Sequence, residues 1–377
     1  MIKYWLILLP LFILLLNGCV DSKEIESLGI INTRGIDLQE DGKLKTTIVY
    51  FQFDARSKDI AKIVFGEGDT VKGARANANY KTNFELTPGQ IRLEIYGMKA
   101  AKKGLLPYLD TLARDAKVSD TMFLALSNST AEEIITMGKE NLSIDVEHYL
   151  YRLIEQTIND DIIPRTNLHD FTHTYYDVGK DPIIPMLKIK EGRPYLYAMA
   201  LFKEDKYAGS ISTVDAFLLN ILEKQVETTL MELTLPIEPI KDHLVRADAN
   251  QDDDTFSVLL SVVNGHGQSR LTNFHDLEFE TNVDVEFRLL ELTREINLEA
   301  KVETLLEKEI EKNIEKRYTD LLKKVQDLDA DPFGYGSIYR SQKRTGKLTD
   351  DEWRNKLSDI KVKYNVNAKL IRHGITE

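Results

Sequence analysis

Alternating or continuous apolar side chains predict β-strands in the first third of the chain. A strand is expected around residues 30–38, and the segment 45–53 is rich in β-branched and aromatic residues. They are separated by Asp41-Gly42, a pair typical of tight turns, so together they predict a hairpin. The predicted strands span residues 30–38, 45–53, 91–96 and 122–126.

Helical patterns lie between and after these strands. Residues 98–115 predict a helix with an internal break at its glycine and proline. The sequence Ser129–Glu132 is a capping box that should begin another helix, and Ser212–Asp215 should cap a third. Several prolines within residues 160–194 predict irregular chain between two folded units. A strand is expected at 195–202. The alternation of predicted strands and helices along the chain favours an α/β or α+β fold.

The clearest pattern occurs in the last third of the chain. Residues 283–289 alternate as a strand with one polar face. Apolar side chains then recur at helical spacing from 298 to 325 among many Glu and Lys, which predicts a long amphipathic helix. Residues 362–370 alternate again, so we expect a sheet with a helix laid across it. We interpret Gly265-His266-Gly267 as a hairpin tip.

Length and charge limit the possible classes of protein. A chain of 377 residues is too long for one ordinary core and predicts two or three compact units. The formal net charge of −12 repels nucleic acid, so we expect no nucleic-acid partner. A single cysteine excludes an intramolecular disulfide, and stability must therefore come from packed cores.

That cysteine follows an apolar N-terminal segment. Lys3 precedes the uncharged residues 5–16, which are too few for a comfortable membrane span but suit a signal peptide. Leu16-Asn17-Gly18-Cys19 then matches a lipobox, in which the thiol receives a diacylglycerol before cleavage. The sequence predicts a signal peptide at 1–18 and a lipid anchor on Cys19 outside the cytoplasm. A secreted protein with a stray cysteine and an uncleaved N-terminal anchor are the alternatives.

The polar residues form no recognisable catalytic constellation. His169 and His173 are four residues apart and could bind a metal on a helix, but nearby prolines disfavour a long helix. We interpret them as surface histidines, and Asp252–Asp254 as a solvated loop. No G-x-S-x-G nucleophile elbow occurs in the sequence. We therefore assign no catalytic, cofactor-binding or metal-binding residue and expect no enzyme.

Asp331-Pro332-Phe333-Gly334-Tyr335-Gly336 is conspicuous in composition. It has neither the glycine spacing nor the Lys-Ser/Thr pair of a phosphate-binding loop. We interpret it as the end of the long helix, with Pro and Gly stopping the helix and the aromatic rings covering the core.

Several of these segments together resemble the C-subunit lipoproteins of spore germinant receptors, the GerAC-like or Ger(x)C family. Val20 stands where that family usually has an aromatic residue. The matching segments are Gly18–Ile25, Leu28–Ile30, Gln90–Gly97, Ala101, Gly104-Leu105, Leu109-Asp110, Arg114-Asp115, Asp181-Pro182, Pro185, Ala198–Lys203, Asp205-Lys206, Gly209, Asp331–Gly336, Trp353 and the terminal strand to Gly374.

The resemblance implies a three-domain α+β fold, with mixed sheets flanked by helices. We expect residues 19–205 to form an N-terminal germination-protein region and 206–377 a C-terminal domain containing the strand, long helix and strand. The resemblance also implies a receptor complex in the inner spore membrane with two integral membrane subunits, A and B, that triggers nutrient-dependent germination. It supplies no active site and leaves germinant binding by this subunit open. A solute-binding lipoprotein that captures a small nutrient directly is the alternative function.

Overall fold

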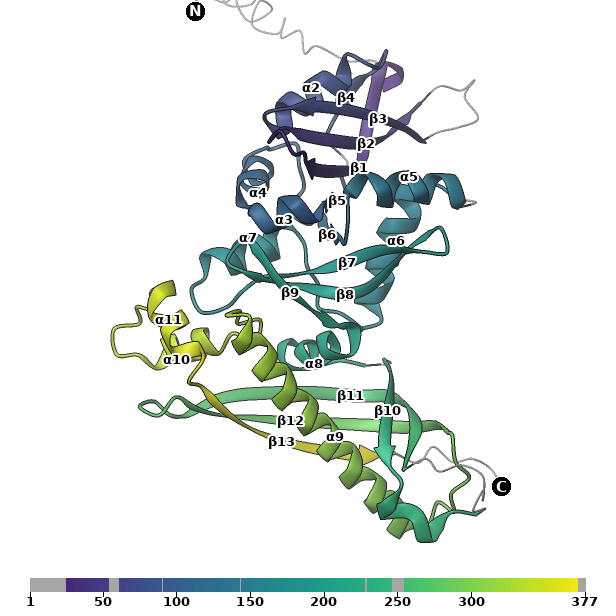
Figure 1. Cartoon of the computed structure of the whole chain (residues 1–377), viewed down its shortest axis with the longest axis vertical. Coiled ribbons are helices and arrows are strands. Elements are labelled where there is room, and N and C mark those ends of the chain that lie inside the picture. Colours follow the sequence, from purple (N-terminus) through teal and green to yellow (C-terminus); the bar gives the residue numbers. More distant parts are fainter. Residues whose placement is uncertain are drawn as a thin grey trace, which may run out of the picture.

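The computed structural model describes residues 25–53, 61–89, 91–142, 144–227, 229–245 and 254–371. Within these residues the strands form two sheets that follow one another along the long axis of the molecule (Figure 1). We refer to them as the N-terminal sheet and the C-terminal sheet. The expected α+β class, with mixed sheets flanked by helices, is confirmed. The division into three domains stays a prediction.

The N-terminal sheet has the strand order β3-β2-β1-β5-β6-β7-β8-β9, with β4 pairing beside β1. Its centre, β1-β5-β6-β7, is parallel, and antiparallel strands extend it at both ends. Its strands are β1 Leu28–Leu38, β2 Leu44–Gln52, β3 Ala61–Gly68, β4 Glu85–Thr87, β5 Leu93–Tyr96, β6 Phe123–Ser127, β7 Ile183–Lys190, β8 Arg193–Lys203 and β9 Lys206–Ser212. A short 3₁₀ helix, η1 Ile25–Ser27, precedes β1.

Helices cover both faces of this sheet, which explains why its central strands are apolar on both sides. Successive residues of one strand enter different cores: Ile48 and Tyr50 pack in one, and Val49 in the other. The first core is completed by α2 Val71–Asn79, α3 Met98–Lys103, α4 Leu106–Ala113 and α7 Leu168–Tyr176. The second is completed by α5 Ala131–Asn141, α6 Val146–Asn159 and α8 Thr213–Glu223.

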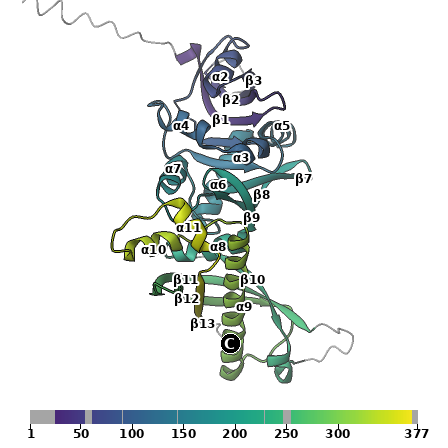
Figure 2. The same ribbon diagram turned by 60° about the vertical axis from the view of Figure 1, so that its left-hand side comes forward.

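The C-terminal sheet has the order β10-β11-β12-β13, and only β12 and β13 are parallel. Helix α9 crosses one face of it, as the sequence pattern predicts (Figure 2). The elements are β10 Leu230–Pro236, η2 Glu238–His243, β11 Thr255–Asn273, β12 Glu278–Leu292, α9 Ala300–Asp327, α10 Tyr335–Gln342, α11 Asp350–Leu357 and β13 Lys361–Leu370. The core beneath α9 is continuous with the second core of the N-terminal sheet.

Charge complementarity on the other face of this sheet helps to set the register of β12 and β13. Acidic residues of β12 lie opposite lysines of β13, and Asn367 donates to Asp284 at 2.9 Å. A shift of one residue would bring the opposite face of β13 outward and lose every one of these pairs. The facing pairs are Glu278 with Lys361, Glu280 with Lys363, and Glu286 with Lys369.

The free edge of β13 is covered by glutamates of α9. The backbone N–H groups of Val366, Ala368 and Leu370 donate to carboxylates at 3.2, 3.1 and 2.9 Å. The acceptors recur every four residues of the helix, a rise of about 6 Å, and the donors every two residues of the strand, a rise of about 6.6 Å. The two spacings are similar, so each glutamate lies opposite one backbone N–H. We call the three acceptors, Glu315, Glu311 and Glu307, the glutamate ladder.

Two sequence interpretations are wrong: the first because a local capping box outweighs the prolines, and the second because glycine serves close packing between distant residues. Residues 160–194 are not irregular throughout but contain α7 and β7. An Asn167–Asp170 capping box begins α7. Pro185 is tolerated in β7 because pairing with β6 involves only Met186 and Leu187.

The second error concerns Gly265-His266-Gly267, which lie inside the long strand β11 instead of at a hairpin tip. The glycines are needed because α8 and the residues after it pack closely on the strand. A Cβ atom at Gly267 would lie 2.4 Å from Leu222, and one at Gly265 would lie 2.9 Å from Val226. The actual turn between β11 and β12 falls at residues 274–277.

Other local predictions are confirmed. The β1–β2 hairpin turns at Asp41-Gly42, where Gly42 has a φ of 85°. The helix predicted within 98–115 divides into α3 and α4 at the expected break. Helix α5 begins one residue later than the predicted capping box implies, because Thr130 is the N-cap and the carboxylate of Asp37 accepts the next two N–H groups.

Candidate functional site at the junction of the two sheets

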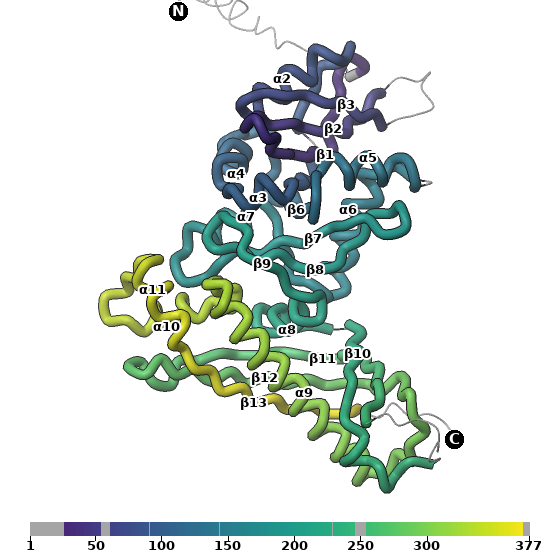
Figure 3. The backbone as a smooth tube through the Cα atoms, viewed as in Figure 1, coloured from purple at the N-terminus to yellow at the C-terminus, as the bar shows by residue number. Residues whose placement is uncertain are grey.

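The best-formed polar site lies where the chain turns back from the C-terminal sheet toward the N-terminal sheet (Figure 3). Helix α9 ends at Asp327, and Asp329 and Gly334 adopt left-handed φ values of 49° and 76°. This loop carries Asp331 into the interior, where its side chain is buried. The helix stop predicted for this segment is therefore confirmed, and Asp331 has a further role.

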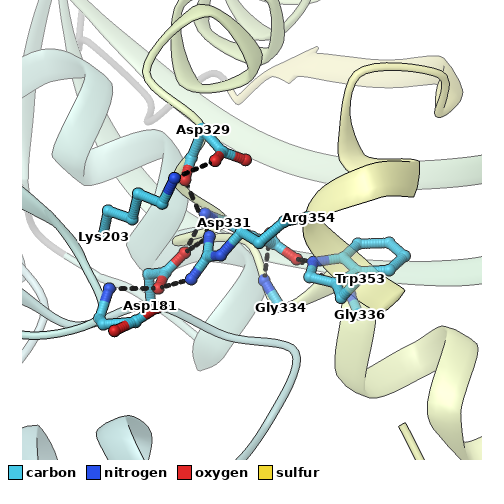
Figure 4. A network of polar contacts seen from close by, with 9 residues as sticks. Asp181, Lys203, Asp329, Asp331, Gly334, Gly336, Trp353 and Arg354 are labelled. Carbon is cyan, nitrogen blue, oxygen red and sulfur yellow. Dashed lines mark hydrogen bonds and ion pairs between the residues drawn. The ribbon is translucent and has the colours of Figure 1, made fainter. Parts of the chain in front are cut away.

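Asp331 accepts three hydrogen bonds with its carboxylate (Figure 4). Its Oδ1 accepts from the N–H of Gly334 at 2.9 Å. Its Oδ2 accepts from the N–H of Gly336 at 2.9 Å and from the indole Nε1 of Trp353 at 3.1 Å. One carboxylate thus positions the start of α10 against the tryptophan of α11.

Asp181, just before β7, connects this loop to the N-terminal sheet. The Asp331 N–H donates to its Oδ2 at 2.6 Å, and the Asp181 N–H donates back to the Asp331 carbonyl at 2.8 Å. Its Oδ1 accepts from the N–H of Glu204, in the β8–β9 turn, at 3.0 Å. Three loops from distant parts of the sequence therefore meet at one buried carboxylate.

Arg354 neutralises Asp181 with a bidentate ion pair. Its Nη1 and Nη2 each donate to one carboxylate oxygen at 2.5 Å, and Nη1 also donates to the Asp329 carbonyl at 2.8 Å. Lys203 of β8 adds an ion pair with Asp329. We call Asp181, Asp331 and Arg354 the junction network. Paired guanidinium and carboxylate groups offset the cost of burying each charge.

Burial sets the proton affinities in this network. Burial raises the pKa of Asp331 to about 6, and the negative charge of Asp181 contributes to the rise, whereas the Gly336 N–H lowers it. Burial alone would lower the pKa of Arg354, but the hydrogen bond and charge of Asp181 raise it above its ordinary value. The guanidinium therefore stays charged, and Asp331 is the group that titrates near neutral pH.

Two glycines let the backbones of the two sheets approach at this point. A Cβ atom at Gly336 would lie 2.5 Å from the Cα of Gly179 and 2.7 Å from the Trp353 ring. The Ser337 N–H donates to the Gly179 carbonyl at 3.0 Å. No larger residue fits at either glycine without moving the backbone.

A cleft of about 640 Å³ lies beside the junction network. His169 and His173 border it from α7, with ring centroids 5.8 Å apart. In the described part of the chain, no group of three or more His, Cys, Asp or Glu is placed to hold a metal ion. Helix α7 forms despite the nearby prolines, and both histidines are exposed on it.

The charged side chains of this cleft take part in ion pairs, three of which lie on the wall itself. Every Asp, Glu, Lys and Arg on its wall has an ion-pair partner. The pairs are Lys180 with Glu223, Lys224 with Asp161, Arg165 with Asp170, and Asp181 with Arg354.

Cys19 and the rest of the expected signal peptide lie outside the described residues, as do Asp252 and Asp253. The junction network was not predicted, because Asp181 is 150 residues from Asp331 and 173 from Arg354. The available signal was the conspicuous composition around Asp331 and the adjacent Trp353-Arg354 pair, which places an aromatic and a cation side by side.

Two helix-flanked sheets joined by a buried polar network define a multi-domain α+β protein whose best-formed site is an internal interface. Residues 21–189 match the model described as the spore germination protein N-terminal domain, and 198–374 the model described as spore germination B3/GerAC-like, C-terminal. The chain therefore belongs to the GerAC-like, or Ger(x)C, family, the family of germinant receptor C subunits.

Individual relatives agree with this assignment. The chain is 26% identical to spore germination protein GerQC of Bacillus cereus, over 383 residues that cover the whole of both chains. It also resembles the crystal structure of the GerBC protein with a TM-score of 0.55 and 16% identity, covering 93% of this chain and 100% of that one. The second likeness shows a shared fold.

Proposed function

We propose that this chain is the lipid-anchored C subunit of a nutrient germinant receptor, which assembles with integral membrane subunits A and B to trigger spore germination. The observation that carries the proposal is family membership over both halves of the chain. The lipobox Leu16–Cys19 supports the anchor, because a diacylglyceryl-cysteine carries two acyl chains, and two are enough for stable attachment. The folded part would face the extracytoplasmic side of the inner spore membrane.

Within this assembly the chain acts as a scaffold that presents two rigidly connected sheets to its partners. The junction network and the shared core support this role, since they connect the sheets with charge-assisted bonds and apolar packing. Among the described residues, no helix combines the length and apolarity that crossing a bilayer requires. In this proposal the lipid on Cys19 holds the chain at the membrane, where it meets the A and B subunits.

Co-purification from spore membranes tests the assembly. The full chain with a C-terminal affinity tag is captured in mild detergent, and the A and B subunits are detected by mass spectrometry. An equally abundant, tagged lipoprotein of another family is the control. Recovery of both subunits with this chain alone supports the proposal. Their absence from every preparation, with the tagged chain present and folded, contradicts it.

A further inference from the structure

Glu147 is a buried carboxylate to which no other residue in the described part of the chain donates. It is the second residue of α6 and only 1% exposed, and neither of its carboxylate oxygens has a hydrogen-bond partner. Glu94 is equally buried but receives two bonds from Arg34, at 2.9 and 2.6 Å, and one from the Tyr96 hydroxyl at 2.8 Å. Since buried carboxylates are normally satisfied, Glu147 needs an explanation.

A small hollow adjoins this carboxylate, where α5 and α6 meet β2 and β3. Its volume is about 290 Å³, and it is separate from the cleft beside the junction network. Apart from Glu147, Lys139 and Asp145, its wall is apolar. The apolar wall residues are Val49, Ala61, Ile63, Leu142, Ile144 and Val146.

The charged residues that the structure describes around the hollow leave one negative charge in excess. Apart from Glu147, those on the described wall are Lys139, from α5, and Asp145, before α6, and their charges cancel. The Lys139 ammonium donates to the Ala61 carbonyl at 3.4 Å instead of to Glu147. Burial raises the pKa of Glu147 to about 7, so the carboxyl group is ionised above neutral pH. A singly charged cation would then balance the site.

We propose that this hollow binds a small alkylammonium ion. Its ammonium group would donate to the Glu147 carboxylate once a rotation of this side chain brings its buried oxygens to the hollow, and its alkyl body would pack against side chains such as Val49 and Ile63. A metal cation fits less well, because the wall offers few oxygen ligands where such ions take six or more. The hollow exists in the single chain, so binding there does not depend on the receptor assembly proposed above.

Calorimetry and thermal unfolding of the full chain in mild detergent at pH 8 test this site. The probes are isobutylammonium chloride, the neutral alcohol isobutanol, and potassium chloride. Glu147→Gln preserves the side-chain shape and removes the charge. Glu140→Gln, at an exposed position of α5, is the matched control.

Isobutylammonium should raise the melting temperature of the wild type and of Glu140→Gln, while isobutanol and potassium should not. Glu147→Gln should bind it about ten- to a hundredfold more weakly, the loss expected for charge-assisted hydrogen bonds. Binding to the wild type should also weaken at pH 6, where Glu147 is mostly protonated. Equal binding by Glu147→Gln, or no binding of isobutylammonium by the wild type, would overturn the proposal.

Discussion

Three buried carboxylates differ in how the protein compensates for the hydration that each loses on burial. Asp331 is surrounded by three hydrogen-bond donors and Glu94 by Arg34 and a tyrosine hydroxyl, whereas no other described residue donates to Glu147. Asp331 therefore acts as a structural centre, and Glu94 as part of a closed ion pair inside a core. Only Glu147 keeps free hydrogen-bonding capacity, which is why it, and not the others, is assigned a ligand.

Arg354→Met should destabilise the fold by about 3–5 kcal/mol, because it leaves the Asp181 carboxylate buried without its cation. Urea unfolding followed by circular dichroism measures the change. Arg344→Met, at an exposed position, is the matched control and should change the free energy of unfolding by less than about 0.5 kcal/mol. Equal effects of the two substitutions would contradict the importance of the ion pair.

The raised pKa of Asp331 predicts a defined pH dependence. The folded state holds this proton more tightly than the unfolded state, whose pKa is 3.8, so the stability contribution is complete below that pH and is lost as pH rises through about 6. The loss is at most about 3 kcal/mol. Unfolding measured by Trp353 fluorescence should show a steeper decline for the wild type than for Asp331→Asn. Parallel curves for the two proteins would refute the assignment.

At this scale the sequence identifies residues whose chemistry depends on close neighbours in the chain. Cys19 is predicted by the residues just before it, and the Ser212 cap by a residue three positions away. The partners of Asp181 could not be predicted, because only folding brings them together. The same holds for Glu147, whose isolation depends on how two helices pack on a hairpin.

At the level of elements, the glutamate ladder explains how an exposed strand edge is kept from pairing with another chain. A free edge presents unpaired N–H groups that can pair with another chain. On β13 these groups are occupied by carboxylates of α9, spaced by one helical turn. The long helix therefore covers the sheet and also closes its edge.

Replacing Glu307, Glu311 and Glu315 together by Ala should open this edge. We expect a loss of about 1.5–4.5 kcal/mol, from about 0.5–1.5 kcal/mol for each of the three hydrogen bonds, and a tendency to self-associate through β13. The triple Gln variant keeps a side-chain carbonyl at each position and should sediment as the wild type does. Analytical ultracentrifugation at several concentrations distinguishes the variants. An Ala variant as stable and as dispersed as the Gln variant would contradict this role of the ladder.

Secondary structure was predictable wherever local pattern and tertiary environment agree. The strand, long helix and strand of the C-terminal sheet have strong periodicity, so β12, α9 and β13 were anticipated. Prediction failed at 160–194, where a capping box outweighs the prolines, and at Gly265–Gly267, where glycine serves close packing instead of a turn. Composition alone cannot distinguish these uses of proline and glycine.

For the whole molecule, the two sheets are joined by apolar packing as well as by the junction network. The second core continues from the N-terminal sheet through α8 to α9, and the Tyr318 hydroxyl of α9 donates to the Leu218 carbonyl of α8 at 2.8 Å. The Gly179–Gly336 contact adds a close backbone approach at the periphery. These contacts favour a single rigid scaffold over two independently moving domains.

Gly336→Ala should disturb this arrangement by forcing apart the Gly179 backbone and the Trp353 ring. We expect a loss of about 1–3 kcal/mol, typical of overpacking, and faster proteolysis between the two sheets. Gly89→Ala is the matched control, because a Cβ atom there has no neighbour closer than 4.0 Å. Unfolding and limited proteolysis of both variants measure the effect. Wild-type behaviour of Gly336→Ala would show that the contact can relax without cost.

The central claim, a lipid-tethered receptor subunit, is tested most directly by fractionating spores that carry wild-type protein or Cys19→Ala. Membrane attachment and nutrient germination are scored together at matched protein levels. We predict that the variant leaves the membrane, keeps its fold and fails to support germination. Normal germination by a variant that has left the membrane would contradict the account, because the anchor would then be dispensable for receptor function.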